Sequence, residues 1–387
     1  MIVIKGIVPA FLLLLLLGIP TQPVAGDEQD IRSVLDALEP DSMMADIERL
    51  VAFDTRFMGS DSNWAAVAWI KNRFEGMEYA VRLDSFEVNV DRRVAGNSYV
   101  LEKLVQANVV AARRGVISPD KKIVIGAHYD TISLDFVQAE QDFAPGADDN
   151  ATGVAAVLEI ARLVSDLQIG LTIEFVLFGS EELGLIGSDA YAASALADGE
   201  DIVLMLGLDV LGTRSEVFPN AFTLDTTSPT LALAEQIADA AEAFTDVFSR
   251  DGSSNSRVMV TALGCRCSDH QSFLNRGFPA IGVFQYFANP AEHINMSVDT
   301  IEHVDIVYVS EITRAILAGT LEIAGFPRRS PDFDGSGIVD FSDFLAFSEV
   351  FGSDVMDTSE ERFDLDEDGT IAFSDFLIFS GNYGRVY

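Results

Sequence analysis

Short apolar segments alternate with helical patterns through the middle of the chain, and this alternation constrains the fold most. The apolar segments are Lys122–Ala127, Leu171–Phe178, Ile202–Leu208 and Ala280–Phe287. The segments with helical spacing are Gly153–Val164, Leu231–Ala243 and Asp305–Ile323. Strands that alternate with helices predict an α/β fold with a largely parallel sheet covered on both faces. In such sheets, functional sites form beyond the carboxyl ends of the strands.

The preceding part of the chain extends this sheet. Ser42–Phe57 and Asn63–Phe74 have apolar residues at helical spacing, and we expect these helices to pack on an outer face of the sheet. Val81–Val90 and Tyr99–Val110 alternate in the manner of antiparallel strands. The predicted sheet is therefore mixed and mostly parallel.

Histidine and acidic residues follow the predicted strands. They are His128, Asp130, Glu181, Glu182, Asp209 and His293. A glycine-bracketed acidic turn, residues 145–153, contains Asp148 and Asp149 and leads into a predicted helix. Adjacent aspartates at a helix start are often only a cap. Because parallel strands bring all these side chains to one edge, we expect a paired metal site there.

Carboxylates and imidazoles bind hard and borderline divalent metals, and a bridging carboxylate holds two such ions roughly 3.5–4 Å apart. The rigid acidic turn makes Asp148 the expected bridge. We expect His128 and Asp209 to complete one metal position, and Glu182 and His293 to complete the other.

Two further carboxylates have expected roles beside the metals. Asp130 is two residues after His128 and is expected to accept its second ring N–H, which fixes the tautomer. Glu181 is left without a metal and is expected to act as the general base, passing a proton from water to a leaving amine.

These motifs resemble the aminopeptidase Y and bacterial leucyl aminopeptidase family of co-catalytic zinc exopeptidases. The matching residues are His128–Thr131, Gly146–Gly153, Glu181–Gly184, Asp209 and Ser268–His270, within about residues 40–324. The resemblance implies a three-layer α/β/α sandwich with two zinc ions, the ligands and base named above, and removal of the N-terminal residue from peptides. It also implies a cis peptide bond between Asp148 and Asp149. His270 is expected near the site but not on a metal.

One spacing departs from the family pattern. The family usually places an Asp-Thr pair four residues after its last histidine ligand, whereas Asp299-Thr300 begins six residues after His293. Asn289-Pro290 precedes His293 at the expected distance, which favours His293 as the ligand, with His303 as the alternative. The segments Ser133–Phe143 and Val217–Thr227 are expected to be pocket-lining loops.

Three other functions fit parts of the pattern. A glutaminyl cyclase shares the fold but uses one zinc, so metal stoichiometry distinguishes it. A non-catalytic adhesion or receptor domain on this scaffold would be expected to lack ligands or the base. A carboxypeptidase or dipeptidase would use the same metals on a different substrate.

The N-terminus, residues 1–26, has the pattern of an export signal, with Lys5, the apolar core Gly6–Ile19 and the small residues Val24–Gly26. An uncleaved anchor is the alternative, but the apolar run is shorter than the roughly 20 residues that span a bilayer. We therefore expect a secreted protein, either extracellular or periplasmic, without a membrane segment after cleavage. A net charge of −36 argues against nucleic acid and anionic membranes as partners. Cys265 and Cys267 are either a disulfide or two free thiols.

After the peptidase-like region 27–324 and a linker at 325–331, an internal repeat occupies 332–387. Asp332–Gly352 and Asp364–Gly384 share Phe-Ser-Asp-Phe-Leu. The spacing predicts two calcium loops rather than a solvated acidic linker. The expected ligands are Asp332, Asp334, Ser336, Ile338, Asp340 and Asp343 in the first loop, and Asp364, Asp366, Asp368, Thr370 and Asp375 in the second. Helices are expected at Phe344–Phe351 and Phe376–Phe379.

This small all-α module resembles a type I dockerin, which implies two Ca²⁺ ions and docking onto a cohesin-type protein partner, with association to a cell surface as one consequence.

Overall fold

The computed structural model describes residues 28–95, 98–135, 141–250, 256–262, 264–265, 267–286, 291–325, 331–334, 336, 338–355, 360–365 and 369–384. The expected export signal, most of the linker, and the expected calcium ligands Asp366 and Asp368 lie outside these residues. Within the described part of the chain, no helix is both long enough and apolar enough to cross a membrane.

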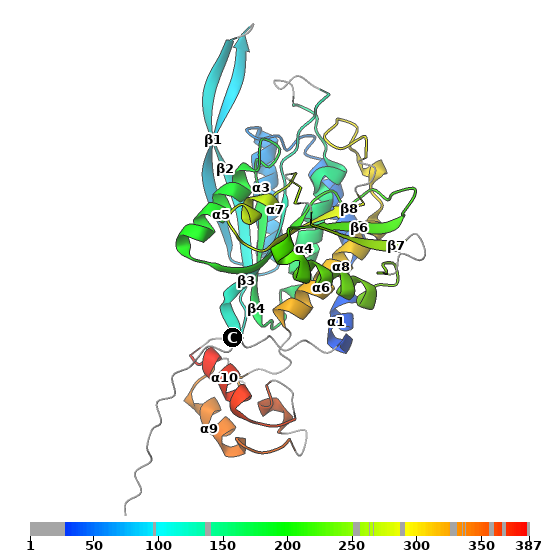
Figure 1. Cartoon of the computed structure of the whole chain (residues 1–387). Coiled ribbons are helices and arrows are strands. Elements are labelled where there is room, and N and C mark those ends of the chain that lie inside the picture. Colours follow the sequence, from blue (N-terminus) through cyan, green and yellow to red (C-terminus); the bar gives the residue numbers. More distant parts are fainter. Residues whose placement is uncertain are drawn as a thin grey trace, which may run out of the picture.

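The described strands form one eight-stranded sheet in the order β1-β2-β4-β3-β5-β8-β6-β7 (Figure 1). Their bounds are Val81–Ala95 (β1), Ser98–Arg113 (β2), Ser118–His128 (β3), Leu171–Phe178 (β4), Asp201–Leu208 (β5), Asn220–Asp225 (β6), Ser256–Thr261 (β7) and Ala280–Gln285 (β8). The central strands β4, β3, β5 and β8 are parallel, and β1 and β2 form an antiparallel hairpin at one edge. The prediction of a mixed, mostly parallel sheet is therefore confirmed at its centre.

The other edge of the sheet was not predicted. β6 runs antiparallel to β8 and parallel to β7. β6 occupies the middle of Val217–Thr227, so the expectation of a pocket-lining loop there is wrong. Its residues Ala221, Phe222 and Leu224 are buried, which explains why this segment pairs with the sheet.

Helices cover both faces of the sheet, because neighbouring residues of a strand point to opposite faces. In β3, Ile123 and Ile125 belong to the larger hydrophobic core, whereas Val124 belongs to a second core on the opposite face. The larger core includes residues of α1 (Glu28–Leu35), α2 (Pro40–Val51), α3 (Asp61–Gly76), α4 (Thr152–Val164), α6 (Leu231–Phe244) and α8 (Ile306–Ala324). The second core includes residues of α5 (Ile186–Asp198) and α7 (His270–Leu274). The result is a three-layer α/β/α arrangement.

The C-terminal module has a hydrophobic core of its own. Phe333, Phe347, Phe363 and Phe379 are among its buried residues. Its helices are α9 (Phe341–Val350) and α10 (Phe373–Asn382), each of which begins three residues earlier than the sequence indicated. The earlier start of α9 has a clear cause, because the side chain of Asp340 caps the helix by accepting the backbone N–H of Ser342.

Candidate metal centre

The carboxyl ends of β3, β4 and β5 bring the expected site residues to one edge of the sheet. His128 ends β3, Glu181 and Glu182 follow β4, and Asp209 follows β5. The His128 Nε2 atom lies 3.2 Å from Asp209 Oδ1 and 3.2 Å from Asp149 Oδ1. His128, Asp149 and Asp209 are buried, and each offers a ligand atom within 4.8 Å of the other two. His128, Glu181 and Glu182 likewise offer ligand atoms within 4.8 Å of one another, and the two glutamates are half-buried.

In the acidic turn, Asp149 rather than Asp148 faces His128. The carboxylate of Asp148 accepts the backbone N–H of Gly212 at 2.7 Å and the hydroxyl of Thr213 at 2.8 Å. The structure therefore places Asp149 in the position expected for Asp148. The cis peptide bond is also one residue later than expected, between Asp149 and Asn150.

Contacts from distant segments hold this turn. The carboxylate of Asp299 accepts the backbone N–H groups of both Asp148 and Asp149, each at 2.9 Å. Burial, reinforced by the charge of Asp148, raises the pKa of Asp299 to about 8. Gly146 has a φ of +54°, and a Cβ atom there would lie 2.3 Å from the Cγ2 atom of Thr131. Only glycine fits this position without moving its neighbours.

Arg56 supports the acidic turn and the loop after β3, and the sequence analysis did not identify it. Its side chain is fully buried and donates four hydrogen bonds, all to backbone carbonyls. Two of the acceptors, Pro145 at 2.7 Å and Gly146 at 2.9 Å, belong to the acidic turn, and Tyr129 at 2.7 Å belongs to the loop after β3. Burial lowers the pKa of Arg56 to about 10, so the side chain stays charged at neutral pH. A lone arginine in an unremarkable segment gave no sequence signal.

Asp130 links the loops that carry His128 and Glu181. Its carboxylate accepts the backbone N–H of Glu181 at 3.0 Å and that of Glu182 at 3.3 Å. The Nδ1 atom of His128 is 3.1 Å from the backbone carbonyl of Asp130 and 3.9 Å from its carboxylate. The acceptor nearest to the Nδ1 atom of His128 therefore belongs to the expected residue, Asp130, but it is the backbone carbonyl and not the side-chain carboxylate. The carboxylate instead positions the two glutamates.

The buried acidic groups of the site suit a divalent cation. Burial raises the pKa of Glu181 well above its ordinary value, and the nearby Asp269 and Asp209 add to the shift. Burial likewise raises the pKa of Glu182, with further repulsion from Asp149 and Glu181. Mutually repelling carboxylates beside an imidazole are the donor set that binds zinc. The residues present therefore fit the expected metal.

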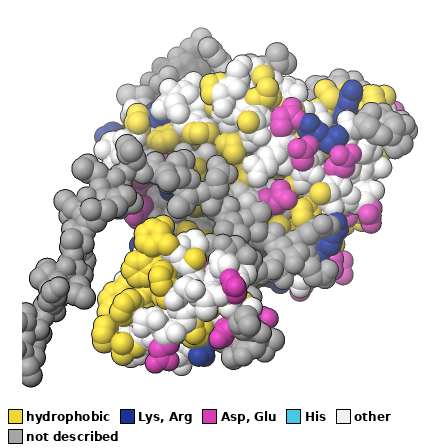
Figure 2. All heavy atoms as spheres, turned by 60° about the horizontal axis from the view of Figure 1, so that its bottom comes forward, with side chains coloured by type: hydrophobic (Ala, Val, Ile, Leu, Met, Phe, Trp, Pro, Cys, Tyr) yellow, Lys and Arg dark blue, Asp and Glu magenta, His cyan; other side chains and the backbone are white. Residues whose placement is uncertain are grey.

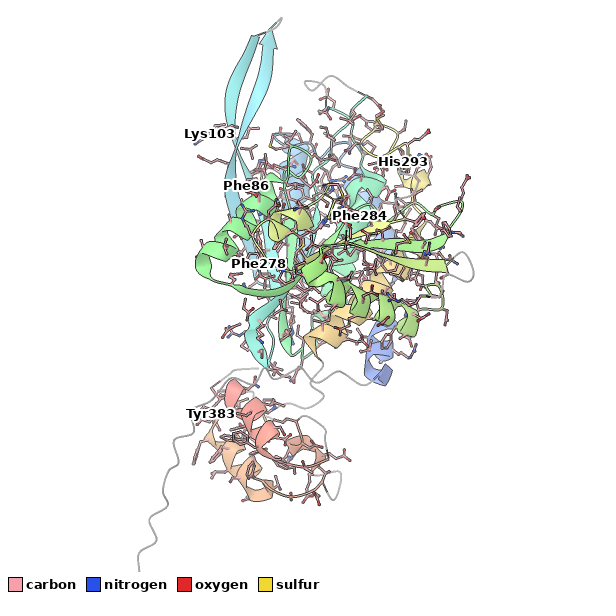
Figure 3. The ribbon with its side chains drawn as sticks, in the orientation of Figure 1. Phe86, Lys103, Phe278, Phe284, His293 and Tyr383 are labelled. Atoms are coloured by element: carbon pink, nitrogen blue, oxygen red, sulfur yellow. A yellow bond between two sulfur atoms is a disulfide. The ribbon has the colours of Figure 1, made fainter. Side chains whose placement is uncertain are left out.

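His293 does not join the His128 group. Its Nε2 atom lies 3.1 Å from Asp148 Oδ2 and 3.3 Å from the hydroxyl of Thr213. Its ring stacks on that of His303, the alternative ligand, with centroids 4.1 Å apart, and His303 is exposed. Figure 3 labels His293 in the segment that follows β8. The expected grouping of His293 with Glu182 is therefore not what the structure shows.

Asn295 contacts Glu182 instead. The end of its carboxamide that faces Glu182 lies 2.7 and 2.8 Å from the two carboxylate oxygens. Because carboxylate oxygens only accept hydrogen bonds, the atom at this end is assigned as the amide nitrogen, which donates to both. Asn295 is four residues before Asp299, which is the spacing at which the resembled family places its last histidine ligand. That spacing is the signal from which Asn295 could have been found.

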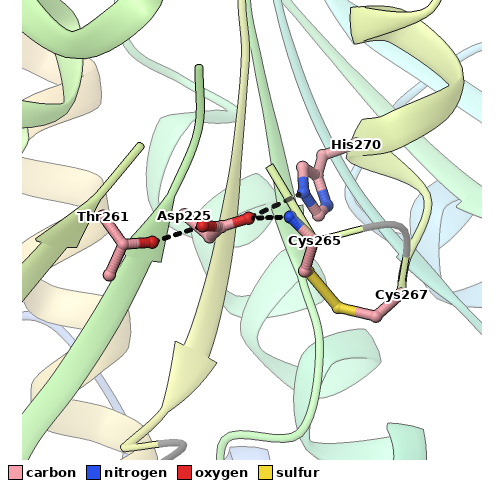
Figure 4. Close-up of a disulfide and its surroundings, with 5 residues drawn as sticks. All are labelled: Asp225, Thr261, Cys265, Cys267 and His270. Atoms are coloured by element: carbon pink, nitrogen blue, oxygen red, sulfur yellow. Dashed lines mark hydrogen bonds and ion pairs between the residues drawn. A yellow bond between two sulfur atoms is a disulfide. The ribbon is translucent and has the colours of Figure 1, made fainter. Parts of the chain in front are cut away.

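The two cysteines form a disulfide, which resolves the alternative that the sequence left open (Figure 4). Asp225, at the end of β6, accepts the backbone N–H of Cys265 at 2.5 Å and the hydroxyl of Thr261. The Nε2 atom of His270 lies 3.7 Å from Asp225 Oδ2. His270 is thus held by a neighbouring structural cluster and is not one of the residues grouped around His128.

A histidine–carboxylate cluster at the carboxyl edge of an α/β/α sandwich, with Glu181 beside it, is the arrangement of a metal-dependent hydrolase. Comparison with known proteins gives the family. Residues 108–320, more than half of the chain, match Peptidase family M28. The chain belongs to this family and is an exopeptidase of the hydrolase class.

Individual relatives agree with this assignment. A probable leucine aminopeptidase of Arthroderma benhamiae is 25% identical over 304 residues, which cover 77% of this chain and 74% of the relative. The solved aminopeptidase from Aneurinibacillus sp. strain AM-1 has a TM-score of 0.62 at 18% identity, covering 76% of this chain and 96% of that one. A glutaminyl cyclase of Bacteroides thetaiotaomicron has a TM-score of 0.55 at 18% identity, covering 73% and 97%. The structural likenesses show the fold alone.

Proposed function

We propose that this protein is a secreted zinc aminopeptidase that removes the N-terminal residue from peptides. The observation that carries the proposal is the buried group of His128, Asp149 and Asp209 beside Glu181, in a chain whose relatives include proteins named leucine aminopeptidase. Secretion rests on the export signal pattern at residues 1–26.

His128, Asp149 and Asp209 would hold one zinc ion, since their ligand atoms already lie close together. Asp149 also acts on Glu182 electrostatically, so Asp149 is the carboxylate suited to face a second metal position. Bound zinc supplies Lewis acidity toward the scissile carbonyl and lowers the pKa of water.

The protein's own residues move the proton. Glu181 takes a proton from the attacking water and donates it to the leaving amine. Burial raises its pKa above the ordinary carboxyl value, which suits a group that must both accept and return a proton. Asp130 keeps Glu181 and Glu182 in place through their backbone N–H groups.

The test is a panel of aminoacyl chromogenic substrates, assayed with zinc, with a chelator, and after zinc is restored. Glu181→Gln is expected to retain the zinc of the wild type and to lose at least about 10²-fold in turnover, because it removes only the proton acceptor. Wild-type turnover in this variant would remove Glu181 from the role of base.

The same panel distinguishes the other candidates. Cyclisation of N-terminal glutamine without aminopeptidase activity would favour a glutaminyl cyclase, and release of C-terminal residues or cleavage of dipeptides only would favour a carboxypeptidase or dipeptidase. A protein inactive on every substrate with its zinc bound would favour a non-catalytic domain.

For the C-terminal module, we propose calcium binding in both repeats. Asp332, Asp334 and Asp343 offer ligand atoms within 4.8 Å of one another. Asp343 is fully buried and accepts the backbone N–H groups of Asp334 and Asp340 at 3.0 and 2.9 Å. In the second repeat, the equally buried Asp375 accepts the backbone N–H of Ala372 at 2.7 Å. In each repeat, a buried carboxylate thus accepts hydrogen bonds from backbone N–H groups of its own loop, as expected for paired calcium loops.

The module also carries a duplicated apolar surface. Phe341 and Phe373 are both 59% exposed, and Leu345 and Leu377 are exposed beside them. Figure 2 shows hydrophobic side chains gathered on one face of this module. A repeated exposed apolar pair suits a protein partner, and we propose a cohesin-type partner on the resemblance to dockerins.

A further inference from the structure

We propose that the two metal positions are unequal. The position at His128 binds zinc tightly, whereas the neighbouring position, lined by Asp149, Glu182 and Asn295, offers oxygen ligands only and holds a divalent cation weakly. The inference rests on the proposed metal-dependent function and specifies how its metal site differs on the two sides.

The first step is the contact between Asn295 and Glu182. The carboxamide lies 2.7 and 2.8 Å from the two carboxylate oxygens, close enough for its nitrogen to donate to both. Asn295 holds this position through a left-handed backbone conformation, with a φ of +61°, and its own carbonyl accepts the N–H of Leu134 at 2.8 Å. The contact is therefore anchored by the backbone on which the side chain stands.

The second step is the fixed spacing between Asn295 and the acidic turn. Asp299, four residues later, accepts the backbone N–H groups of Asp148 and Asp149. Within the intervening turn, the N–H of Asp299 donates to the carbonyl of Met296 at 3.1 Å. Because Asp299 is tied to the turn that carries Asp149, the residue four positions before it is brought beside Glu182. That residue is asparagine in this chain.

The third step is that His293 is engaged elsewhere. Its Nε2 atom is 3.1 Å from Asp148, the aspartate whose carboxylate does not face His128, and its ring is stacked on His303. To reach Glu182, the ring would have to give up both the contact with Asp148 and the stacking. The structure thus supplies one imidazole to the metal centre, from His128.

The donor set then determines the metal preference. Imidazole suits zinc, whereas carboxylate and amide oxygens suit harder cations such as Mn²⁺ and Mg²⁺. A cation at the second position would also have to turn the Asn295 carboxamide so that its oxygen faces inward, which breaks its hydrogen bonds to Glu182. Both effects lower the affinity for zinc there.

The experiment measures metal content in the full chain. The full chain carrying Asp343→Ala and Asp375→Ala, which removes the buried carboxylate of each proposed calcium loop, is saturated with zinc without Ca²⁺, dialysed and analysed for each element. We expect about one retained zinc per chain, and Mn²⁺ added to this form should bind at a second site with at least tenfold weaker affinity than the zinc, measured by calorimetry and electron paramagnetic resonance. Two zinc ions retained after dialysis would overturn the proposal.

Two variants assign the effect to residues. Asn295→His is expected to raise the retained zinc to about two per chain, and His293→Ala is expected to leave it at about one. Loss of zinc in His293→Ala would overturn the proposal. If Asn295→His does not fold, Asn295→Ala tests the same point, since it should keep the tight zinc and weaken Mn²⁺ binding further; unchanged Mn²⁺ affinity would count against Asn295 as a ligand.

These readouts are separate from the proposed activity. A protein with one tight zinc but no aminopeptidase turnover would contradict the proposed function and leave the unequal positions intact. An active aminopeptidase that retains two zinc ions would do the reverse.

Discussion

Replacing Arg56 is the sharpest test of how the metal centre is supported. The guanidinium donates to the carbonyls of Leu50, Tyr129, Pro145 and Gly146, which belong to three separate segments. Arg56→Met keeps much of the volume but removes every donor. The carbonyls would then be left buried without these hydrogen bonds, and the loop after β3 would lose its link to the acidic turn.

The magnitude follows from the number of hydrogen bonds. A hydrogen bond from a charged donor contributes about 1.5–3 kcal/mol, so four contribute about 6 kcal/mol or more. Methionine recovers part of the desolvation cost of burying the guanidinium, which amounts to several kcal/mol. We expect a net loss of about 3–4 kcal/mol in the free energy of unfolding, out of the ~5–15 kcal/mol typical of a domain. Arg56→Lys keeps the charge but has a shorter reach, so we expect about half this loss.

Tryptophan fluorescence during urea unfolding provides the assay. Both tryptophans of the chain, Trp64 and Trp69, lie in α3, so the signal reports on the peptidase domain and not on the C-terminal module. Arg257 is exposed on β7, and Arg257→Met serves as the matched control with an expected change below about 0.5 kcal/mol. A loss of less than 1 kcal/mol in Arg56→Met, with retained zinc equal to that of the wild type, would refute the supporting role of Arg56.

Three further predictions concern other parts of the molecule. Asp130→Ala should lower turnover about 10–100-fold, because Glu181 and Glu182 lose the acceptor of their backbone N–H groups, and it should do so without unfolding the domain; unchanged kcat/KM would contradict this. Asp343→Ala should reduce the calcium-induced change in the far-ultraviolet circular dichroism of the chain, because the first calcium loop loses its buried carboxylate, while aminopeptidase turnover stays at the wild-type level. A calcium titration equal to that of the wild type would count against this calcium loop. The double change Cys265→Ser and Cys267→Ser should cost only about 1–2 kcal/mol, since the disulfide closes a very short loop, and a loss above 4 kcal/mol measured in urea would show that more than loop closure is involved.

The centre of the fold was predictable because its strands contain long apolar, buried stretches. Leu171–Phe178 is buried at every position, and the predicted bounds of this strand match the observed ones. The edge strand β7 was not predictable in the same way, because residues such as Arg257 are exposed, whereas β8 has the same length and is buried at every position. A short, half-exposed segment becomes a strand through its pairing partner, which local sequence does not reveal.

The acidic turn shows where sequence reasoning about the site ends. Two adjacent aspartates are chemically identical, and local spacing does not say which of them faces the metal. The choice is made by contacts from far along the chain: Gly212 and Thr213 bind the carboxylate of Asp148, which leaves Asp149 to face His128. Asp299 then fixes the backbone of both aspartates.

The same contact between Asp299 and the acidic turn explains how Asn295 could have been found from the sequence. Because Asp299 is bound to the turn, counting back from Asp299 is a better guide to the residue beside Glu182 than counting forward from Asn289-Pro290. Counting back four residues gives Asn295, which contacts Glu182, whereas His293, six residues before Asp299, contacts Asp148. The spacing from Asn289-Pro290 thus led to His293, which does not contact Glu182, whereas the spacing from Asp299 leads to Asn295, which does. The metal content of Asn295→His, set against that of His293→Ala, decides whether this geometric reasoning also holds for the bound ion.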